Sequence, residues 1–528
     1  MSLQKLKFSN RLNKQLPADP NTDNCCRSVE NSVYSWVNPT PTSQPSLISV
    51  NQPLASQLGF NSDDCHSPLF TNVMTGNSLI KGMKPYALCY GGHQFGQWAG
   101  QLGDGRAINL AEIETAQLGY QTLQLKGAGK TPYSRRADGL AVLRSSIREY
   151  LCSEAMFNLG IPTTRALSIA LTGDQVIRDK MYDGNAEFEQ CAVVCRVSPS
   201  FLRFGSIQLP ASRGDEKLVK QIVEYSINND YPHLKPLPEQ EFTAQTYLNW
   251  FKAVCDNTSL MIVNWMRVGF VHGVMNTDNM SLIGETIDYG PYGWIDNFDL
   301  GWTPNITDES QKRYRFGGQF QVSQWNLFQL ANAIFPLINE VEPLQAIMSD
   351  YAINYETQWQ KMMSQKLGFK DYQGVTDLHI FQALETLLAE VETDMTLFYR
   401  QLATYKNNDD AIDHFQTCFY QADQLTASYQ NNLKHWLQRY QARLNFDGLS
   451  DTDRQTNMNK VNPKYVLRNY LAQQAIELAE QGDYSELETL QALLLKPYDE
   501  QLHYSKYAQK RPDWAREKVG CSMLSCSS

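Results

Sequence analysis

The 528-residue chain lacks any apolar run long enough to cross a membrane. Residues 260–263 and 493–495 are typical of its longest apolar stretches, whereas a spanning helix needs about 20 consecutive apolar residues. The N-terminal segment has no apolar signal core. The chain also lacks a basic excess, since its formal net charge is −10, and this opposes bulk electrostatic binding to nucleic acid or to an anionic membrane. We therefore expect a cytoplasmic protein with no nucleic-acid or membrane partner.

Cysteines are also too few and too unevenly spaced for a disulfide scaffold, with 11 in the whole chain. Cys191 and Cys195 lie in an apolar run that is typical of a buried strand. No second Cys or His pair nearby could complete a zinc site with them. A reducing compartment fits this cysteine usage, and the 42% apolar content predicts a folded globular protein.

Hard oxygen ligands gather between residues 278 and 288. Asp278 and Asn279 are adjacent, and Asp288 opens the motif DYGP. Carboxylate and amide oxygens of this kind hold Mg²⁺ beside substrate phosphates. Protein kinases use the same parts, but their Asn lies several residues beyond the catalytic Asp. The pattern predicts a metal-nucleotide site that is kinase-like without following the kinase standard.

Two glycine-dense segments come earlier, YGGHQFGQ at residues 90–97 and QLGDGR at residues 101–106. Glycine lets backbone N–H groups approach a phosphate closely. A turn of this composition, taken alone, also fits a plain hairpin. The alternating residues 107–112 that follow predict a strand.

A lysine and a glutamate then follow in an order that suggests an ion pair. Residues 122–126 alternate like a strand and end at Lys126, and residues 142–159 have helical spacing and contain Glu149. In kinases a strand lysine pairs with a helix glutamate and contacts the nucleotide phosphates. Each residue alone also fits ordinary surface charge, so the prediction depends on the motifs around them.

Arginines cluster in the same zone of this acidic chain. Guanidinium groups match phosphate oxygens bidentately. A solvated loop would explain each arginine singly, but together they favour an anion site. The five are Arg106, Arg135, Arg136, Arg196 and Arg203.

With these motifs the chain resembles the selenoprotein O family, which are pseudokinase-fold protein adenylyltransferases. The resemblance implies an enzyme that binds ATP in a reversed pose and moves AMP to Ser, Thr or Tyr hydroxyls of proteins. Matching blocks occur in the family's order at residues 90–96, 125–135, 272–279, 288–291, 462–469 and 526–528.

The resemblance implies a role for each matching residue. It makes Asp278 the proton acceptor, and it makes Glu149 the partner that orients Lys126. It assigns Asn279 and Asp288 as ligands of Mg²⁺ or Mn²⁺. It implies a nucleotide site formed by Gly103, Gly105, Arg106, Lys126, Asp138, Gly139, Arg196, Arg203 and Asp288. A preference for UTP, a conventional kinase-like phosphotransferase and a non-catalytic pseudokinase stay open as alternatives.

One family feature is missing from this chain. The resemblance implies a disulfide between a loop position, here Pro304, and Cys526 in the tail. Proline cannot form that bond, and Cys521 is the other cysteine of the tail. We therefore expect Cys526 not to act through residue 304.

For the fold we expect an α+β, protein-kinase-like, two-lobed architecture with a helical C-terminal extension. Residues 1–215 are predicted to form a mixed nucleotide-binding lobe, and residues 216–430 a helical lobe with the catalytic and metal loops. Residues 431–528 are predicted to form the extension, which ends in a mobile tail. Helical spacing covers residues 242–270, 321–337 and 462–495, and Trp325, Phe328 and Phe335 are predicted core residues.

Overall fold

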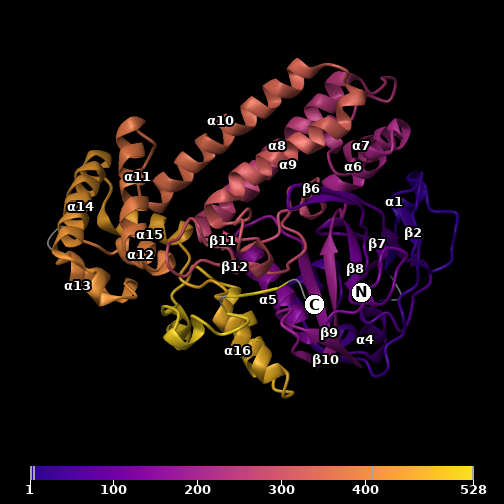
Figure 1. The fold of residues 1–528 in the computed structure, drawn as a ribbon, viewed down its shortest axis with the longest axis horizontal. Helices are drawn as coiled ribbons and strands as arrows, with labels where there is room; N and C mark the ends of the chain where they lie inside the picture. The colour runs from indigo at the N-terminus through magenta and orange to yellow at the C-terminus, as the bar shows by residue number, and fades with distance from the viewer. Residues whose placement is uncertain (1–2, 4–5, 407–408, 522, 526–528) are drawn as a thin grey trace.

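The N-terminal part of the molecule is built on an antiparallel sheet (Figure 1). The structure is a computed structural model that describes residues 3, 6–406, 409–521 and 523–525. The strands of the large sheet follow the order β2-β4-β7-β8-β10-β9-β3, with β1 paired to β7, and β5-β6 and β11-β12 form two small sheets. The strands are β1 (Lys7–Phe8), β2 (Tyr34–Trp36), β3 (Ser46–Val50), β4 (Tyr86–Leu88), β5 (Gly91–Gln94), β6 (Gln97–Gln101), β7 (Ala107–Thr115), β8 (Gly119–Lys126), β9 (Arg165–Asp179), β10 (Ala186–Ser198), β11 (Phe270–Val271) and β12 (Gly293–Trp294).

Both faces of this sheet are buried. In β10, Ala192 and Val194 belong to the hydrophobic core that contains α5, whereas Val193 and Cys195 belong to the core beneath α2 and α4. Successive side chains of a strand point to opposite faces, so a continuous apolar run is what a strand covered on both faces requires. The predicted buried strand around Cys191 and Cys195 is confirmed.

Helices make up most of the remaining chain. The helices α8 and α10 run side by side, and α11 to α15 lie at the end of the molecule away from the sheet (Figure 1). The helices are α1 (Arg11–Gln15), α2 (Gln52–Leu58), α3 (Ser62–Cys65), α4 (Pro68–Met74), α5 (Leu143–Asn158), α6 (Phe204–Ser212), α7 (Glu216–Asn229), α8 (Ala244–Val268), α9 (Gln319–Ile334), α10 (Val341–Lys366), α11 (Val375–Glu390), α12 (Met395–Leu402), α13 (Ala411–Phe415), α14 (Ala427–Asp447), α15 (Asp451–Val461), α16 (Asn469–Ala479) and α17 (Ser485–Leu494).

Two sequence predictions about the helical part were wrong. Residues 462–495 form two helices, α16 and α17, and begin with a non-helical stretch at residues 462–468. This stretch is not helical because Pro463 cannot continue the preceding helix. Phe328 and Phe335 are not core residues, since they are 52% and 37% exposed. Trp325 is half-buried. The helices predicted within residues 142–159, 242–270 and 321–337 are confirmed.

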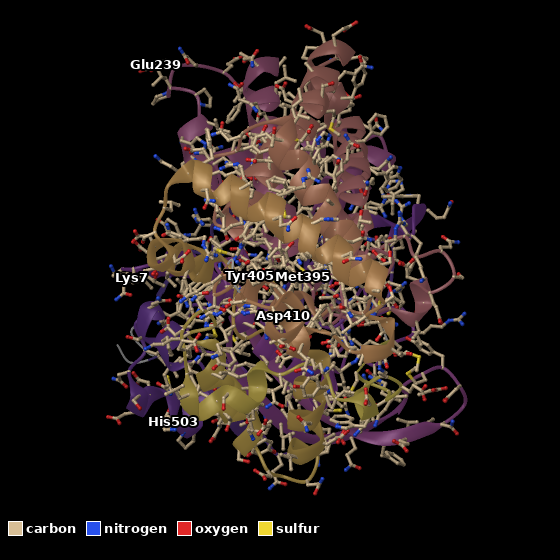
Figure 2. All side chains as sticks on the ribbon, turned by 90° about the vertical axis from the view of Figure 1, so that its left-hand side faces the viewer. Lys7, Glu239, Met395, Tyr405, Asp410 and His503 are labelled. Carbon is tan, nitrogen blue, oxygen red and sulfur yellow. The ribbon has the colours of Figure 1, made fainter. Side chains whose placement is uncertain are left out.

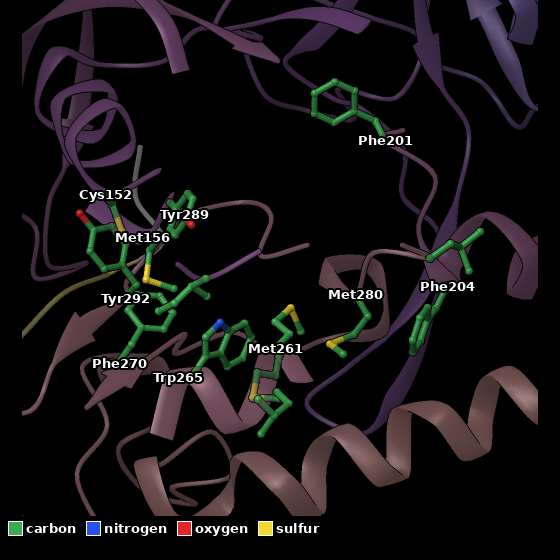
Figure 3. Packing of buried hydrophobic residues seen from close by; sticks show 14 of the residues in the cluster. Cys152, Met156, Phe201, Phe204, Met261, Trp265, Phe270, Met280, Tyr289 and Tyr292 are labelled. Carbon is green, nitrogen blue, oxygen red and sulfur yellow. The ribbon is translucent and has the colours of Figure 1, made fainter. Parts of the chain in front are cut away.

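A dense aromatic core holds the DYGP turn in place. Tyr289 of this turn and Tyr292, which directly follows it, lie near Cys152 and Met156 of α5 (Figure 3). The Tyr292 hydroxyl donates a 2.7 Å hydrogen bond to the Arg148 carbonyl. The turn that carries Asp288 is therefore fixed to the same helix that carries Glu149.

Polar and charged side chains reach the periphery of the molecule, as Lys7, Glu239 and His503 do (Figure 2). None of the helices in the described ranges is long and apolar enough to cross a membrane. The architecture is mixed α/β with antiparallel sheets, which agrees with the α+β part of the fold prediction. The predicted domain boundaries at residues 215 and 430 stay predictions.

Candidate active site

A cleft of about 690 Å³ opens beside the ends of β7 and β8. It is lined mainly by polar and charged side chains and by three glycines. Its lining includes almost all the predicted site residues: Gly103, Gly105, Arg106, Lys126, Asp138, Gly139, Arg196, Arg203, Asp278 and Asp288. Residues that are far apart in the sequence thus meet at one site.

Two glycines of the cleft are required by the backbone. Gly103 has φ of 85°, and a Cβ atom there would lie 2.5 Å from the Tyr133 ring. Gly139 has φ of 79°, and its Cβ would lie 2.3 Å from the Gly129 backbone. Side chains at these positions would be strained and would also collide with the cleft wall.

The predicted lysine–glutamate pair is present behind the cleft. Lys126 Nζ lies 2.7 Å from Glu149 Oε2, and the two side chains are only 5% and 1% exposed. Arg196 Nε also donates to Glu149. Burial alone would raise the pKa of Glu149, but Arg196 and Lys126 hold it below its usual value. Burial lowers the pKa of Lys126 to about 8, although Glu149 opposes this shift.

Asp288 is the carboxylate on which the cations converge. Arg196 Nη2 lies 3.0 Å from its Oδ1, Arg203 Nη1 lies 3.4 Å from its Oδ2, and Lys126 Nζ lies 3.9 Å from Oδ1. Burial would raise its pKa, but Arg203, Arg196 and Lys126 hold that pKa well below its usual value. The side chain is still 33% exposed toward the cleft. It is therefore an ionised carboxylate that remains accessible from the cleft.

Asp278 is more deeply buried than Asp288. It lies in the 3₁₀ turn Thr277–Asn279, and its backbone carbonyl accepts a 2.8 Å hydrogen bond from Arg203 Nη1. Gln94 Nε2 donates to its Oδ2 at 3.3 Å, and its Oδ1 has no hydrogen-bond partner. Burial raises the pKa of Asp278 to about 6. A carboxyl group with this pKa is suited to accept a proton near neutral pH.

The residues present fit a Mg²⁺ or Mn²⁺ ion held together with a nucleotide. Asn279 Nδ2 donates a 2.9 Å hydrogen bond to the Val274 carbonyl, which leaves the amide oxygen to act as a ligand. The described residues contain no cluster of three or more His, Cys, Asp or Glu side chains positioned for a metal. Mg²⁺ characteristically takes one or two carboxylates and completes its shell with substrate phosphates and water. Asn279 is outside the cleft lining, unlike Asp288.

Three contacts of the site were missed from the sequence. Gln94 contacts Asp278, and the buried Asp104 lies 3.7 Å from Arg203. Arg178 binds Asp138 through two hydrogen bonds of 2.8 Å. Gln94 and Asp104 lie within the two glycine-dense motifs, so the sequence carried a local signal that could have identified these two contacts. Arg178 lies in an ordinary strand, β9, and carries no local signal.

The C-terminal tail returns to the loop that contains Pro304. The Leu524 N–H donates to the Pro304 carbonyl at 3.0 Å, and the Ile306 N–H donates to the Leu524 carbonyl at 3.0 Å. The ten cysteines in the described part of the chain are free thiols, and Cys521 is buried. Cys526, which we expect not to act through residue 304, lies outside the described residues.

Comparison with known proteins assigns the chain to a family. The family model for protein adenylyltransferase SelO matches residues 20–495. Proteins named protein nucleotidyltransferase YdiU from Flavobacterium johnsoniae, Azoarcus sp. and Rhodopirellula baltica are 53%, 52% and 50% identical to this chain, and each alignment covers at least 99% of both sequences. The chain therefore belongs to the SelO/YdiU family of protein nucleotidyltransferases, enzymes with nucleotide and protein substrates.

Proposed function

We propose that this enzyme transfers AMP from ATP to Ser, Thr or Tyr hydroxyls of proteins with the help of Mg²⁺ or Mn²⁺. The observation that carries the proposal is the convergence of Lys126, Arg196 and Arg203 on one cleft that also contains Asp278 and Asp288. Nucleotidyl and phosphoryl transfer need cationic side chains next to an ionised metal ligand and a carboxylate base. This cleft brings such groups together. The matching family is described as a protein adenylyltransferase, which supports AMP as the transferred group.

In this proposal Asp278 accepts the proton of the attacking hydroxyl. The acceptor oxygen forms a bond to the α-phosphorus, the bond from the α-phosphorus to the bridging oxygen breaks, and pyrophosphate leaves. The pKa of about 6 keeps Asp278 largely ionised at neutral pH, so it is ready to take that proton. Lys126 and Arg196 stabilise the charge that develops on the phosphate oxygens, and Glu149 holds both cations in position.

Asp288 and Asn279 are the side chains that would hold the metal. A bound ion would supply positive charge to the phosphate oxygens. Asp288 also neutralises part of the surrounding cation cluster. The order of a strand lysine, a helix glutamate, Asp278 and the DYGP turn supports a protein-kinase-like two-lobed fold with a helical C-terminal extension as part of the same proposal.

Uridylyl transfer is the second candidate. The relatives are named protein nucleotidyltransferases, and these names do not specify which nucleotide is transferred. The names are therefore equally compatible with UTP. A conventional phosphotransferase would use the same lysine, glutamate and metal ligands. A non-catalytic pseudokinase fits less well, because all five of Lys126, Glu149, Asp278, Asn279 and Asp288 are present.

Label transfer separates these possibilities. The protein is incubated with an acceptor protein and with ATP labelled at the α or the γ position, and with α-labelled UTP in a parallel reaction. We expect label on the acceptor from α-labelled ATP and none from γ-labelled ATP, and we expect Asp278→Asn to lose it. Label from the γ position alone would refute nucleotidyl transfer, and stronger labelling from UTP would favour the second candidate.

A further inference from the structure

The β5-β6 hairpin covers the carboxylate of Asp278. A Cβ atom added to Gly92 of β5 would lie 2.6 Å from Asp278 Oδ1, and Gln94 donates to the other carboxylate oxygen. The His93 N–H donates a 2.7 Å hydrogen bond to Thr277, the residue before Asp278. One strand of this hairpin is thus fixed directly to the 3₁₀ turn that carries Asp278.

The other strand of the hairpin offers a free edge. β6 pairs with β5 on one side, and no other strand in the described ranges pairs with it. Its residues Gln97, Trp98 and Ala99 are exposed. The edge of a strand presents N–H and C=O groups that an extended polypeptide can pair with, whatever its sequence.

A row of aromatic side chains extends from this edge. The Trp98 ring lies 5.0 Å from the His93 ring, which lies 5.3 Å from the Trp325 ring of α9. Arg313 Cζ stacks 4.8 Å above the Trp325 ring. Trp98 is 39% exposed, so part of its ring is open to a partner.

Positive charge is concentrated at the far end of this row. Lys312 and Arg315 are exposed and Arg313 is half-buried, and none of the three forms an ion pair within the described part of the chain. Arg313 Nε is buried without a hydrogen-bond partner. The nearby Asp308 uses its two carboxylate oxygens to accept the backbone N–H groups of Arg313 and Tyr314. These cations stand out in a chain with a net charge of −10.

We propose that this surface binds the acceptor protein as an extended segment with acidic side chains beside the modified hydroxyl. The surface, here called the acceptor platform, consists of His93, Trp98, Lys312, Arg313, Arg315 and Trp325. This proposal rests on the proposed function, because a hydroxyl must reach Asp278 next to the hairpin. Backbone pairing to β6 holds the segment, and the unpaired cations select acidic neighbours by charge complementarity.

The test uses three peptides of equal length that contain one serine, flanked by aspartates, by asparagines or by lysines. Transfer from α-labelled ATP is measured with the full-length protein. We expect the acidic peptide to be labelled faster than the basic one by on the order of tenfold. Arg313→Glu and Lys312→Glu are each expected to reverse this order while the affinity for ATP, measured by calorimetry, stays unchanged. Lys312 is exposed, so its variant does not depend on repacking.

Lys434→Glu is the matched control, because Lys434 is an exposed lysine of α14 far from the hairpin (Figure 1), and it is expected to keep the acidic preference. Equal labelling of the three peptides by the unaltered protein, or an equal loss for all three in both platform variants, would overturn the platform while leaving nucleotidyl transfer intact. Absence of α-label on every peptide and on every protein acceptor would instead refute the proposed function.

Discussion

The Lys126 ammonium lies 2.7 Å from the Glu149 carboxylate, and both groups are almost completely buried. Glu149 also accepts from Arg196, so one carboxylate orients two cations of the cleft. A buried charge left without its partner is costly. This arrangement makes the two members of the pair unequal, because Lys126 can be removed while Glu149 still pairs with Arg196.

Substitutions at the two positions should therefore differ in their effect on stability. We expect Glu149→Gln to lower the free energy of unfolding by about 3–5 kcal/mol, because it removes the buried carboxylate charge that pairs with both Lys126 and Arg196. We expect Lys126→Met to cost clearly less stability but to lose about 2–4 kcal/mol of transition-state stabilisation. Urea unfolding and the transfer assay measure the two effects. A loss of transfer below about threefold in Lys126→Met would return Lys126 to a structural role.

Asp288 has a left-handed backbone with φ of 63°, which guides the choice of substitution. Asn tolerates this conformation better than Ala does. We expect Asp288→Asn to fold normally but to lose both transfer and the metal-dependent part of ATP binding. The reason is that the substitution removes the negative charge of the proposed metal ligand. Asp288→Ala should show the same losses with reduced stability. ATP affinity measured with and without Mg²⁺ tests this, and unchanged transfer in Asp288→Asn at saturating metal would refute the assignment.

The pH profile should report the ionisation of Asp278. A general base works only when deprotonated, so transfer should fall as the pH drops through about 6, the pKa of Asp278. The Gln94 amide stabilises the carboxylate and lowers this pKa, so Gln94→Ala should shift the acidic limb to higher pH. Gln94 would then be a positioning residue. An acidic limb that stays in place in Gln94→Ala would contradict this role, whatever happens to the maximal rate.

The tail cysteine should have little influence on transfer through residue 304. Pro304 cannot form a disulfide, and its carbonyl instead accepts a backbone hydrogen bond from Leu524. We expect Cys526→Ser to leave basal transfer nearly unchanged and dithiothreitol to have no effect that depends on Cys526. Activity with and without reductant, in the unaltered protein and in Cys526→Ser and Cys521→Ser, provides the measurement. Reductant activation that disappears in Cys526→Ser would show a disulfide with another cysteine.

The sequence predicted the parts of the site that have fixed spacing. Lys126 and Glu149 were found because a strand and a helix have distinct periods, and Asp278 and Asp288 because their motifs are local. Gln94 and Arg178 were not found as contacts, because only the folded chain brings them to Asp278 and Asp138.

Periodicity had a second limit in the helices. In α9 the spacing of apolar residues indicated a helix correctly, but it could not show which face the rest of the chain covers. Phe328 was therefore assigned to the core, although it is 52% exposed. The break before α16 could have been expected from Pro463.

The chemical identity of the transferred group is the most direct test of the account. An acceptor protein incubated with the enzyme, Mg²⁺ and equal concentrations of ATP and UTP can be examined by intact mass spectrometry, with Asp278→Asn as the inactive control. We predict a mass increase equal to one adenylyl group, located on a Ser, Thr or Tyr side chain and absent from the control. An increase equal to a phosphoryl group, or modification that persists in Asp278→Asn, would contradict the account.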